Sequence, residues 1–247
     1  MADDTIPRRR FLLGAGIAGT AVATGLTSTS ASEAQAPSGT QTPAASAQTT
    51  PAAPAEPQIL LALTATEAAF VSAAVDAFIP ADQLSPSGTD CGIVTFIDRQ
   101  LASAWGGGAK MYRSGPFQKG KPEQGYQLPL TPKEYFSAGI AEANDWSRKT
   151  YGKEFDRLAP ADRTAALKAM EEGKAEFSGL GSKSFFERLL TITMEGFFSD
   201  PIYGGNRNRA SWTMLGFPGL PATYAGKFEE YRSKRYTAHA QSIADFS

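Results

Sequence analysis

Ser182–Phe197 reads SKSFFERLLTITMEGF, and this stretch decides the fold class of the chain. Its large apolar residues follow the spacing of an α-helix rather than the alternation of a strand. We therefore expect a strongly apolar helix here. Its large apolar positions are Phe185, Phe186, Leu189, Leu190, Ile192 and Met194.

Five further segments on either side of this stretch carry helix patterns. Thr64–Glu67 reads TATE, a capping-box pattern, so we expect a helix that begins here and runs to Pro80. Thr131–Glu134 reads TPKE, with Thr as N-cap and Pro at the first helical position, and the helix it starts should run to Tyr151. The other expected helices cover residues 93–105, 160–172 and 224–240, and the last of these is amphipathic and rich in Lys, Arg and Tyr.

The patterns together predict a mainly α protein. No sustained alternation of apolar and polar residues is found, so strands should be few. Hydrophobic residues make up 42% of the 247 positions, which is enough to bury a core. We expect a single compact helical domain of about six helices with long loops over residues 59–247, preceded by a signal peptide and a linker.

Residues 1–36 carry the pattern of an export signal. Arg8 and Arg9 are followed by Phe11 and Leu12, which is the order of a twin-arginine motif. The apolar run that follows is shorter than the roughly 20 residues of a membrane-spanning helix, and small residues typical of a cleavage zone come after it. We therefore interpret residues 1–36 as a twin-arginine signal peptide.

Two other features precede the helical domain. Residues 14–19 read GAGIAG and match a dinucleotide-binding loop, but no second strand ending in an acidic residue follows, so we reject that interpretation. Residues 37–58 contain five prolines among Ala, Thr, Ser and Gln, without an aromatic residue. Such a segment cannot bury enough apolar area to offset its ordering entropy, which predicts a disordered linker.

The charge balance and the counts of Cys and His exclude several functional classes. The chain has 24 Lys and Arg against 25 Asp and Glu, whereas nucleic-acid-binding proteins usually carry a strongly basic surface. Cys91 is the one cysteine and His239 the one histidine, so the chain alone cannot form a disulfide, a zinc finger, a Cys-ligated iron–sulfur cluster or a multi-His metal site. We expect a buried, inert Cys91, no catalytic, cofactor-binding or metal-binding residue in this chain, and no nucleic-acid partner.

The loop after the apolar helix has the composition of a protein–protein interface. Asp-Pro and Gly-Gly-Asn are turn formers, and the loop brings aromatic residues and an Arg together on these turns. The residues alone leave two interpretations open: the aromatic side chains form a binding surface, or they plug the end of a helical bundle. The candidate interface residues are Phe198, Asp200, Pro201, Ile202, Tyr203, Gly204, Gly205, Asn206, Arg207, Trp212, Phe217 and Pro218.

This loop also resembles a known family. Asp200–Asn206 (DPIYGGN), Trp212 and Gly216–Gly219 (GFPG) resemble the signature of the gluconate 2-dehydrogenase subunit 3 family. Leu63–Glu67 and Ala77–Asp82 (AFIPAD) fit the family as well, and so does the twin-arginine start. The likeness covers about residues 59–225.

The resemblance implies the small subunit of a membrane-bound sugar or sugar-acid dehydrogenase that faces the periplasm. In such complexes a large FAD-containing subunit of the glucose–methanol–choline type oxidises the alcohol, and a multi-haem cytochrome c subunit passes the electrons to the quinone pool. The small subunit carries no known cofactor, and in several complexes it holds the only twin-arginine signal for the flavoprotein. We therefore expect FAD and haem c in partner subunits, contact with the twin-arginine export machinery, and a periplasmic location at the cytoplasmic membrane through the complex.

Two other functional classes stay open at this stage. An enzyme acting alone, such as a periplasmic hydrolase that uses acidic residues of this chain, would turn over its substrate without partners. A free-standing periplasmic binding or scaffold protein would be a stable monomer with a ligand pocket and no accompanying flavoprotein.

Overall fold

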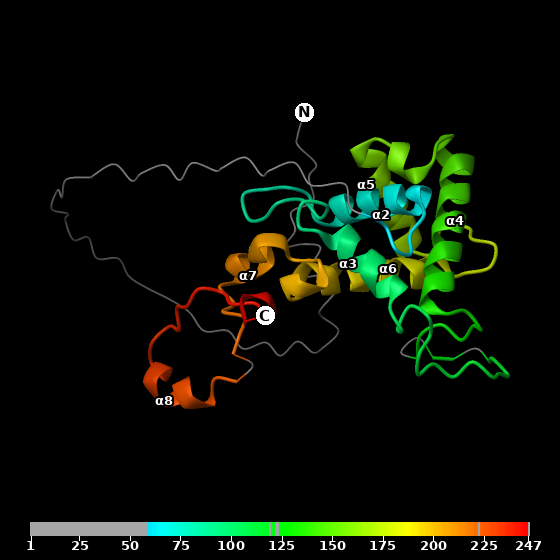
Figure 1. Ribbon diagram of the computed structural model, residues 1–247. Coiled ribbons are helices and arrows are strands. Elements are labelled where there is room, and N and C mark those ends of the chain that lie inside the picture. The colour runs from blue at the N-terminus through cyan, green and yellow to red at the C-terminus, as the bar shows by residue number, and fades with distance from the viewer. Residues whose placement is uncertain (1–58, 119, 122–123, 222, 247) are drawn as a thin grey trace, which may run out of the picture. The chain divides into compact units, whose positions relative to one another are not determined.

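The computed structural model describes residues 59–118, 120–121, 124–221 and 223–246 (Figure 1). The expected signal peptide and linker, residues 1–36 and 37–58, lie outside this described part. Within it the chain forms seven α-helices and no β-strand, and the one strand-like feature is a parallel bridge between Gly219 and Gln241. The prediction of a mainly α protein is thus confirmed.

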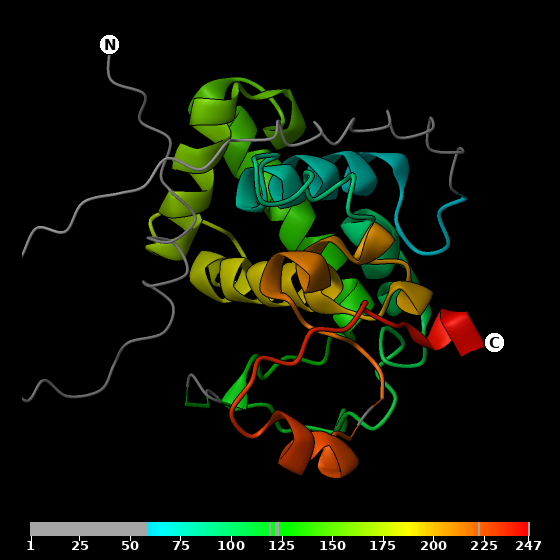
Figure 2. The same cartoon turned by 90° about the vertical axis from the view of Figure 1, so that its left-hand side faces the viewer.

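Five helices of ten or more residues build the core, and shorter helices follow in the C-terminal part. In both views α2 lies above α6, and the loop that carries α8 extends away from the helical core (Figures 1 and 2). The α-helices are α2 (Ala65–Phe78), α3 (Ile93–Ala102), α4 (Pro132–Tyr151), α5 (Pro160–Glu171), α6 (Ser182–Phe198), α7 (Ala210–Leu215) and α8 (Phe228–Tyr231). The 3-10 turns are η2 (Phe155–Arg157), η3 (Pro201–Tyr203), η4 (Arg207–Arg209), η5 (Ala225–Lys227) and η6 (Ile243–Phe246).

The predicted capping box at Thr64 is present, and the predicted helix start at Thr131 forms a capping box as well. The backbone N–H of Thr64 donates to the carboxylate of Glu67 at 2.7 Å, and the N–H of Glu67 donates back to the hydroxyl of Thr64 at 3.3 Å. Thr131 and Glu134 repeat this exchange at 2.7 and 3.2 Å. These reciprocal bonds satisfy backbone donors that the first turn of a helix leaves without an intrahelical partner, and so they set where α2 and α4 begin.

Aromatic side chains from α2 and α6 meet in the core. The ring of Phe70 on α2 lies 6.2 Å from that of Phe185 on α6 and 4.7 Å from that of Phe155 in η2. At the end of α2, the ring of Phe78 packs edge to face against that of Phe186 on α6, with 5.6 Å between the ring centres. The apolar stretch that predicted α6 therefore places its phenylalanines in the centre of the domain.

Two predicted helices differ from the structure. The helix expected over residues 93–105 ends at Ala102, and Trp105 is exposed in the turns that follow. The hydroxyl of Ser103 donates at 2.7 Å to the carbonyl of Gln100, which a continuing helix would pair with the N–H of Ala104. This local side-chain bond competes with the helix and ends it.

The prediction of a helix over residues 224–240 is wrong. The structure has only η5 and the four-residue α8 there, and Phe228 remains exposed. Tyr224 and Tyr231 both pack against Tyr236, at 5.6 and 4.7 Å between ring centres, so the tyrosines of this segment pack against one another. An amphipathic helix of this length is marginal in water unless its apolar face is buried against other elements.

Candidate subunit interface

The candidate interface begins where α6 ends. Ser199 takes an extended conformation, and Asp200 caps η3 by accepting a 3.0 Å hydrogen bond from the N–H of Ile202. Pro201 supplies the first residue of this 3-10 turn, and its carbonyl accepts from Gly204 at 2.9 Å. The Asp-Pro pair therefore turns the chain sharply and leaves Ile202 and Tyr203 at the tip of the turn.

The glycine pair at positions 204 and 205 brings the loop close to the core helices. Gly204 has a backbone φ of 99°, which residues other than glycine rarely adopt. A Cβ on Gly205 would collide with the carbonyl oxygen of Gly196 near the end of α6. The loop therefore folds back directly onto the helix from which it started.

Asn206 ties the two ends of the loop together. Its side chain is fully buried and its backbone is left-handed, with φ 44° and ψ 41°. The amide Nδ2 donates to the carbonyl of Ser199 at 2.9 Å, while Oδ1 accepts from the N–H and the hydroxyl of Ser211 at 3.0 and 2.8 Å. Asn tolerates the left-handed region and supplies both a donor and two acceptor positions, so few other residues could occupy this position.

Trp212 lies inside the domain rather than on its surface. Only 7% of the residue is exposed, and its indole N–H donates to the carbonyl of Phe198 at 3.0 Å. Its ring packs edge to face against Phe217 at 5.3 Å. Trp212 thus plugs the end of the helical bundle and supports the ring of Phe217.

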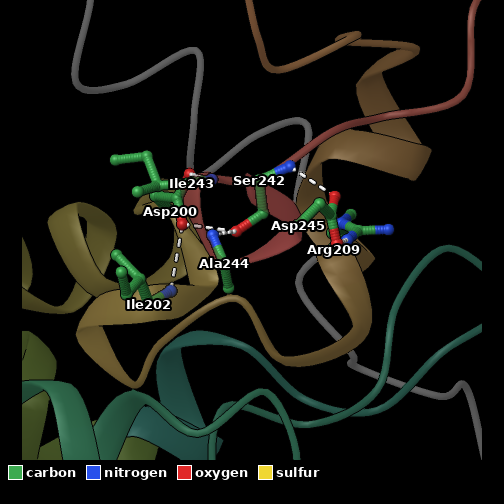
Figure 3. Close-up of polar contacts among 7 residues, drawn as sticks. All are labelled: Asp200, Ile202, Arg209, Ser242, Ile243, Ala244 and Asp245. Carbon is green, nitrogen blue, oxygen red and sulfur yellow. Dashed lines mark hydrogen bonds and ion pairs between the residues drawn. The ribbon is translucent and has the colours of Figure 1, made fainter. Parts of the chain in front are cut away.

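The C-terminal segment closes the loop from outside, through contacts that the sequence pattern did not indicate. The carboxylate of Asp200 accepts from the hydroxyl of Ser242 at 2.6 Å and from the N–H of Ile243 at 2.9 Å (Figure 3). Asp245 in turn accepts from the N–H of Ser242 at 2.8 Å and pairs with Arg209. Residues 241–246 are thereby fastened across the start of the loop, and we call this segment the C-terminal clasp.

The charge state of Asp200 follows from these contacts. Its partial burial alone would raise the pKa of the carboxyl group. Hydrogen bonds from Ser242, Ile202 and Ile243 and the positive charge of Arg209 act in the opposite direction and outweigh burial, so the pKa of Asp200 lies below its ordinary value. Asp200 is therefore ionised at neutral pH and holds the clasp as a carboxylate.

Arg207 and Cys91 connect the loop to the segment before α3. The backbone N–H of Arg207 donates to the carbonyl of Cys91 at 2.9 Å. Cys91 is 1% exposed, as expected of a buried thiol. Arg207 is half-buried beside this segment. Its backbone N–H holds the loop in place, while part of its side chain remains exposed.

The twelve candidate residues fall into three groups. Buried residues hold the loop together, half-buried ones shape it, and exposed ones are available to a partner. Gly205, Asn206 and Trp212 are buried, Asp200, Pro201, Gly204, Arg207 and Pro218 are half-buried, and Phe198, Ile202, Tyr203 and Phe217 are exposed.

Further apolar residues beside the loop are exposed although the composition of the loop did not point to them. Leu215 ends α7, and Ile243 and Phe246 belong to the C-terminal clasp. The contacts of Asp200 bring Ile243 next to Ile202, since both backbone N–H groups donate to the same carboxylate (Figure 3). We call Phe198, Ile202, Tyr203, Phe217 and Ile243 together the loop surface.

The described residues form neither a metal-binding cluster nor a membrane span. No group of three or more His, Cys, Asp or Glu in this part of the chain lies so that it could hold a metal ion. None of the helices in residues 59–246 that the structure describes is both long and apolar enough to cross a bilayer.

The comparison with protein families decides the relationship of the chain. A family model described as gluconate 2-dehydrogenase subunit 3 matches residues 65–219, which include all the long helices and the loop up to the bridge at Gly219. The chain belongs to the gluconate 2-dehydrogenase subunit 3 family. Neither a curated protein nor a solved structure matches it. The C-terminal clasp lies beyond the part matched by the gluconate 2-dehydrogenase subunit 3 model.

Proposed function

We propose that the chain is the non-catalytic small subunit of a periplasmic, membrane-associated dehydrogenase that oxidises a sugar or sugar acid. Its membership of the gluconate 2-dehydrogenase subunit 3 family, matched over residues 65–219, carries this proposal. The family name describes a subunit of a larger dehydrogenase, which suggests partner subunits. We propose that FAD and haem c belong to those partners, as a large flavoprotein subunit and a multi-haem cytochrome c subunit.

The geometry supports the loop surface as the place where the flavoprotein subunit docks. Half of the surface of Tyr203 is exposed (51%), although its turn is fixed by Asp200, Gly204 and the buried side chain of Asn206. Aromatic side chains on a pre-ordered backbone contribute strongly to protein–protein binding, because little conformational freedom is lost when the partner binds. Such contacts would stabilise the flavoprotein subunit.

The export signal completes the proposal. Arg8, Arg9, Phe11 and Leu12 would direct the chain to the twin-arginine machinery, a route that carries folded cargo. A flavoprotein already bound at the loop surface, with its FAD in place, would be exported together with this chain. The small subunit would therefore act as an escort as well as a stabiliser.

Purification from membranes tests the complex. The tagged chain would be isolated from detergent-solubilised membranes, and the absorbance spectrum of the copurifying chains would be recorded. We expect flavin and haem c bands in companion chains and dehydrogenase activity that follows the flavoprotein. A single colourless protein would contradict the proposal and favour a free-standing binding or scaffold protein, whereas turnover by the isolated chain would favour an enzyme acting alone.

A further inference from the structure

A cavity of about 250 Å³ is lined by none of the residues of the loop surface. Its lining residues come from the loop between α3 and α4, from the first turns of α4 and from α6. Four of its lining side chains are aromatic. The lining residues are Trp105, Met111, Gln124, Tyr126, Pro132, Tyr135, Phe136 and Arg188.

Two stacked tyrosines form a rigid wall of this cavity. The rings of Tyr126 and Tyr135 lie nearly parallel with 4.2 Å between their centres. The hydroxyl of Tyr126 donates to the carbonyl of Leu130 at 3.1 Å, and that of Tyr135 lies 3.1 Å from the hydroxyl of Ser184. Burial raises the pKa of both phenols, so the wall is uncharged at neutral pH. Tyr135 is buried behind Tyr126, and the exposed aromatic side chain of the lining is Trp105. The hydroxyl groups of both tyrosines are already engaged.

Arg188 supplies the charge of the lining. Its guanidinium lies over the ring of Tyr126, with 4.8 Å from the guanidinium carbon to the ring centre. Gly125 makes this position possible, because its φ is 72° and a Cβ there would collide with Nη2 of Arg188. Among the described residues no carboxylate forms an ion pair with Arg188. The guanidinium is thus held over the ring of Tyr126, with Nη2 close to the backbone of Gly125.

The other charged groups near this wall are not among the lining residues of the cavity. Arg113 and Glu134 both lie close enough to act on the hydroxyl of Tyr126, and their charged groups are 3.9 Å apart. Glu142 and Glu187 also act on the hydroxyl of Tyr135. Among the described residues that line the cavity itself, Arg188 is the one that carries a charge. A planar guanidinium matches a carboxylate, which can accept two parallel hydrogen bonds from it.

We propose that this cavity binds a small monocyclic aromatic carboxylate. The ring would lie among the aromatic walls, and the carboxylate would pair with the edge of Arg188. A cavity of about 150 Å³ holds benzene, so the space here admits a ring with a short carboxylate-bearing arm. A sugar acid has several hydroxyl groups that would each need a polar partner, and the polar side chains of the lining are Gln124, Arg188 and the two tyrosines, whose hydroxyl groups are already engaged. The proposal does not depend on the proposed function, since it concerns a different part of the chain.

Calorimetric titration of the full chain with phenylacetate tests the proposal. We expect saturable binding of phenylacetate, and binding at least about tenfold weaker for phenylacetamide, which keeps the ring but lacks the charge. Gluconate should give no saturable signal. No saturable binding of phenylacetate at millimolar concentration, or equal affinities for the acid and the amide, would overturn the proposal.

Matched variants place the ligand in the cavity. Arg188→Gln should weaken phenylacetate binding at least about tenfold, and Arg188→Lys should restore it only in part, because lysine lacks the planar fork. Arg148→Gln, which changes an exposed arginine on the outside of α4, should bind as the unchanged chain does. Phenylacetate should also quench tryptophan fluorescence, and Trp105→Phe should abolish this quenching. Undiminished binding by a folded Arg188→Gln chain, or undiminished quenching in Trp105→Phe, would refute this placement.

Discussion

The hydroxyl of Ser242 donates a 2.6 Å hydrogen bond to the carboxylate of Asp200, which stands 42 residues earlier in the chain. The same carboxylate accepts from the backbone of Ile202 within its own turn. Asp200 therefore performs two tasks, since it caps the turn that presents Tyr203 and it fastens the C-terminal clasp beside that turn. Each task uses the ionised form of the carboxyl group.

Acidification should release the C-terminal clasp. Because the pKa of Asp200 is lowered in the folded chain, its contacts contribute fully above the ordinary pKa of about 3.9 and are lost as the pH falls through the lower folded value. The NMR signal of the Ile243 amide should shift on acid titration with that midpoint. Asp200→Asn should increase hydrogen exchange at the same amide at neutral pH, whereas Asp145→Asn, an exposed control, should not. An Ile243 amide as protected in Asp200→Asn as in the unchanged chain would contradict the role of Asp200.

Tyr203→Ala should weaken the complex without destabilising the chain. The side chain is half exposed at the tip of a turn whose backbone other residues hold, so its removal costs contacts with a partner rather than with the core. We expect a loss of about 2 kcal/mol in binding, or roughly 30-fold in affinity for the flavoprotein subunit. Copurification and the melting temperature would be measured together, with Tyr112→Ala as an exposed control outside the loop. If the Tyr203→Ala chain copurified with the flavoprotein subunit as fully as the unchanged chain does, Tyr203 would not be part of the interface.

Trp212→Ala should act on stability first. The indole is buried and its N–H is hydrogen-bonded, so truncation leaves a cavity and an unpaired carbonyl at Phe198, at a cost of about 3–5 kcal/mol in the free energy of unfolding. Trp212→Phe keeps a ring and should cost less, about 1–3 kcal/mol. Urea unfolding measures both. If Trp212→Ala lost the partner while its unfolding free energy stayed the same, Trp212 would be a contact residue despite its burial.

Asn206→Gly separates the hydrogen bonds of Asn206 from its backbone conformation. Glycine accepts the left-handed φ, so this variant loses only the contacts to Ser199 and Ser211, at about 1–3 kcal/mol. Asn206→Ala should cost roughly 1–2 kcal/mol more, because alanine is disfavoured at this φ. Asn208→Gly is the matched control, since Asn208 is also left-handed but exposed, and it should change stability by less than about 1 kcal/mol. Equal stabilities of Asn206→Gly and the unchanged chain would show that the buried amide does not hold the loop.

Arg8→Lys combined with Arg9→Lys should retain the chain in the cytoplasm. If the chain escorts its flavoprotein, that subunit should be retained with it, and periplasmic dehydrogenase activity should fall to background. Cell fractionation followed by activity measurement checks this, with Arg10→Lys as a control that leaves the twin-arginine pair intact. Normal periplasmic activity in the double variant would refute the escort role while leaving a purely stabilising role open.

The C-terminal part of the chain shows where local patterns mislead. Residues 224–240 have the periodicity of an amphipathic helix, yet only Phe228–Tyr231 is α-helical. The pattern predicts which face a helix would bury, but it contains no information about whether another element lies there to cover it. The same applies to Trp105, whose apolar side chain continues the spacing of α3 beyond the helix end at Ala102.

In the loop after α6, too, the sequence predicted one part of the arrangement and the tertiary structure decided the rest. Composition singled out the turn formers and aromatic residues after α6, and it left open whether they form a binding surface or plug the bundle. The structure separates these residues by burial, since Trp212 plugs the bundle and Tyr203 is exposed. The binding role of Tyr203 stays a prediction. The partner of Asp200 in the C-terminal clasp was missed, because no spacing rule relates Asp200 to Ser242.

The sequence by itself determined the α-helical class, the starts of α2 and α4 and the buried phenylalanines of α6, because capping boxes and helical periodicity arise from contacts within a few residues. Only the tertiary structure decided which loop aromatics are buried, which carboxylate holds the C-terminal clasp and where Arg188 meets the stacked tyrosines. These features join side chains that are distant in sequence, and their pairing depends on how the helices pack.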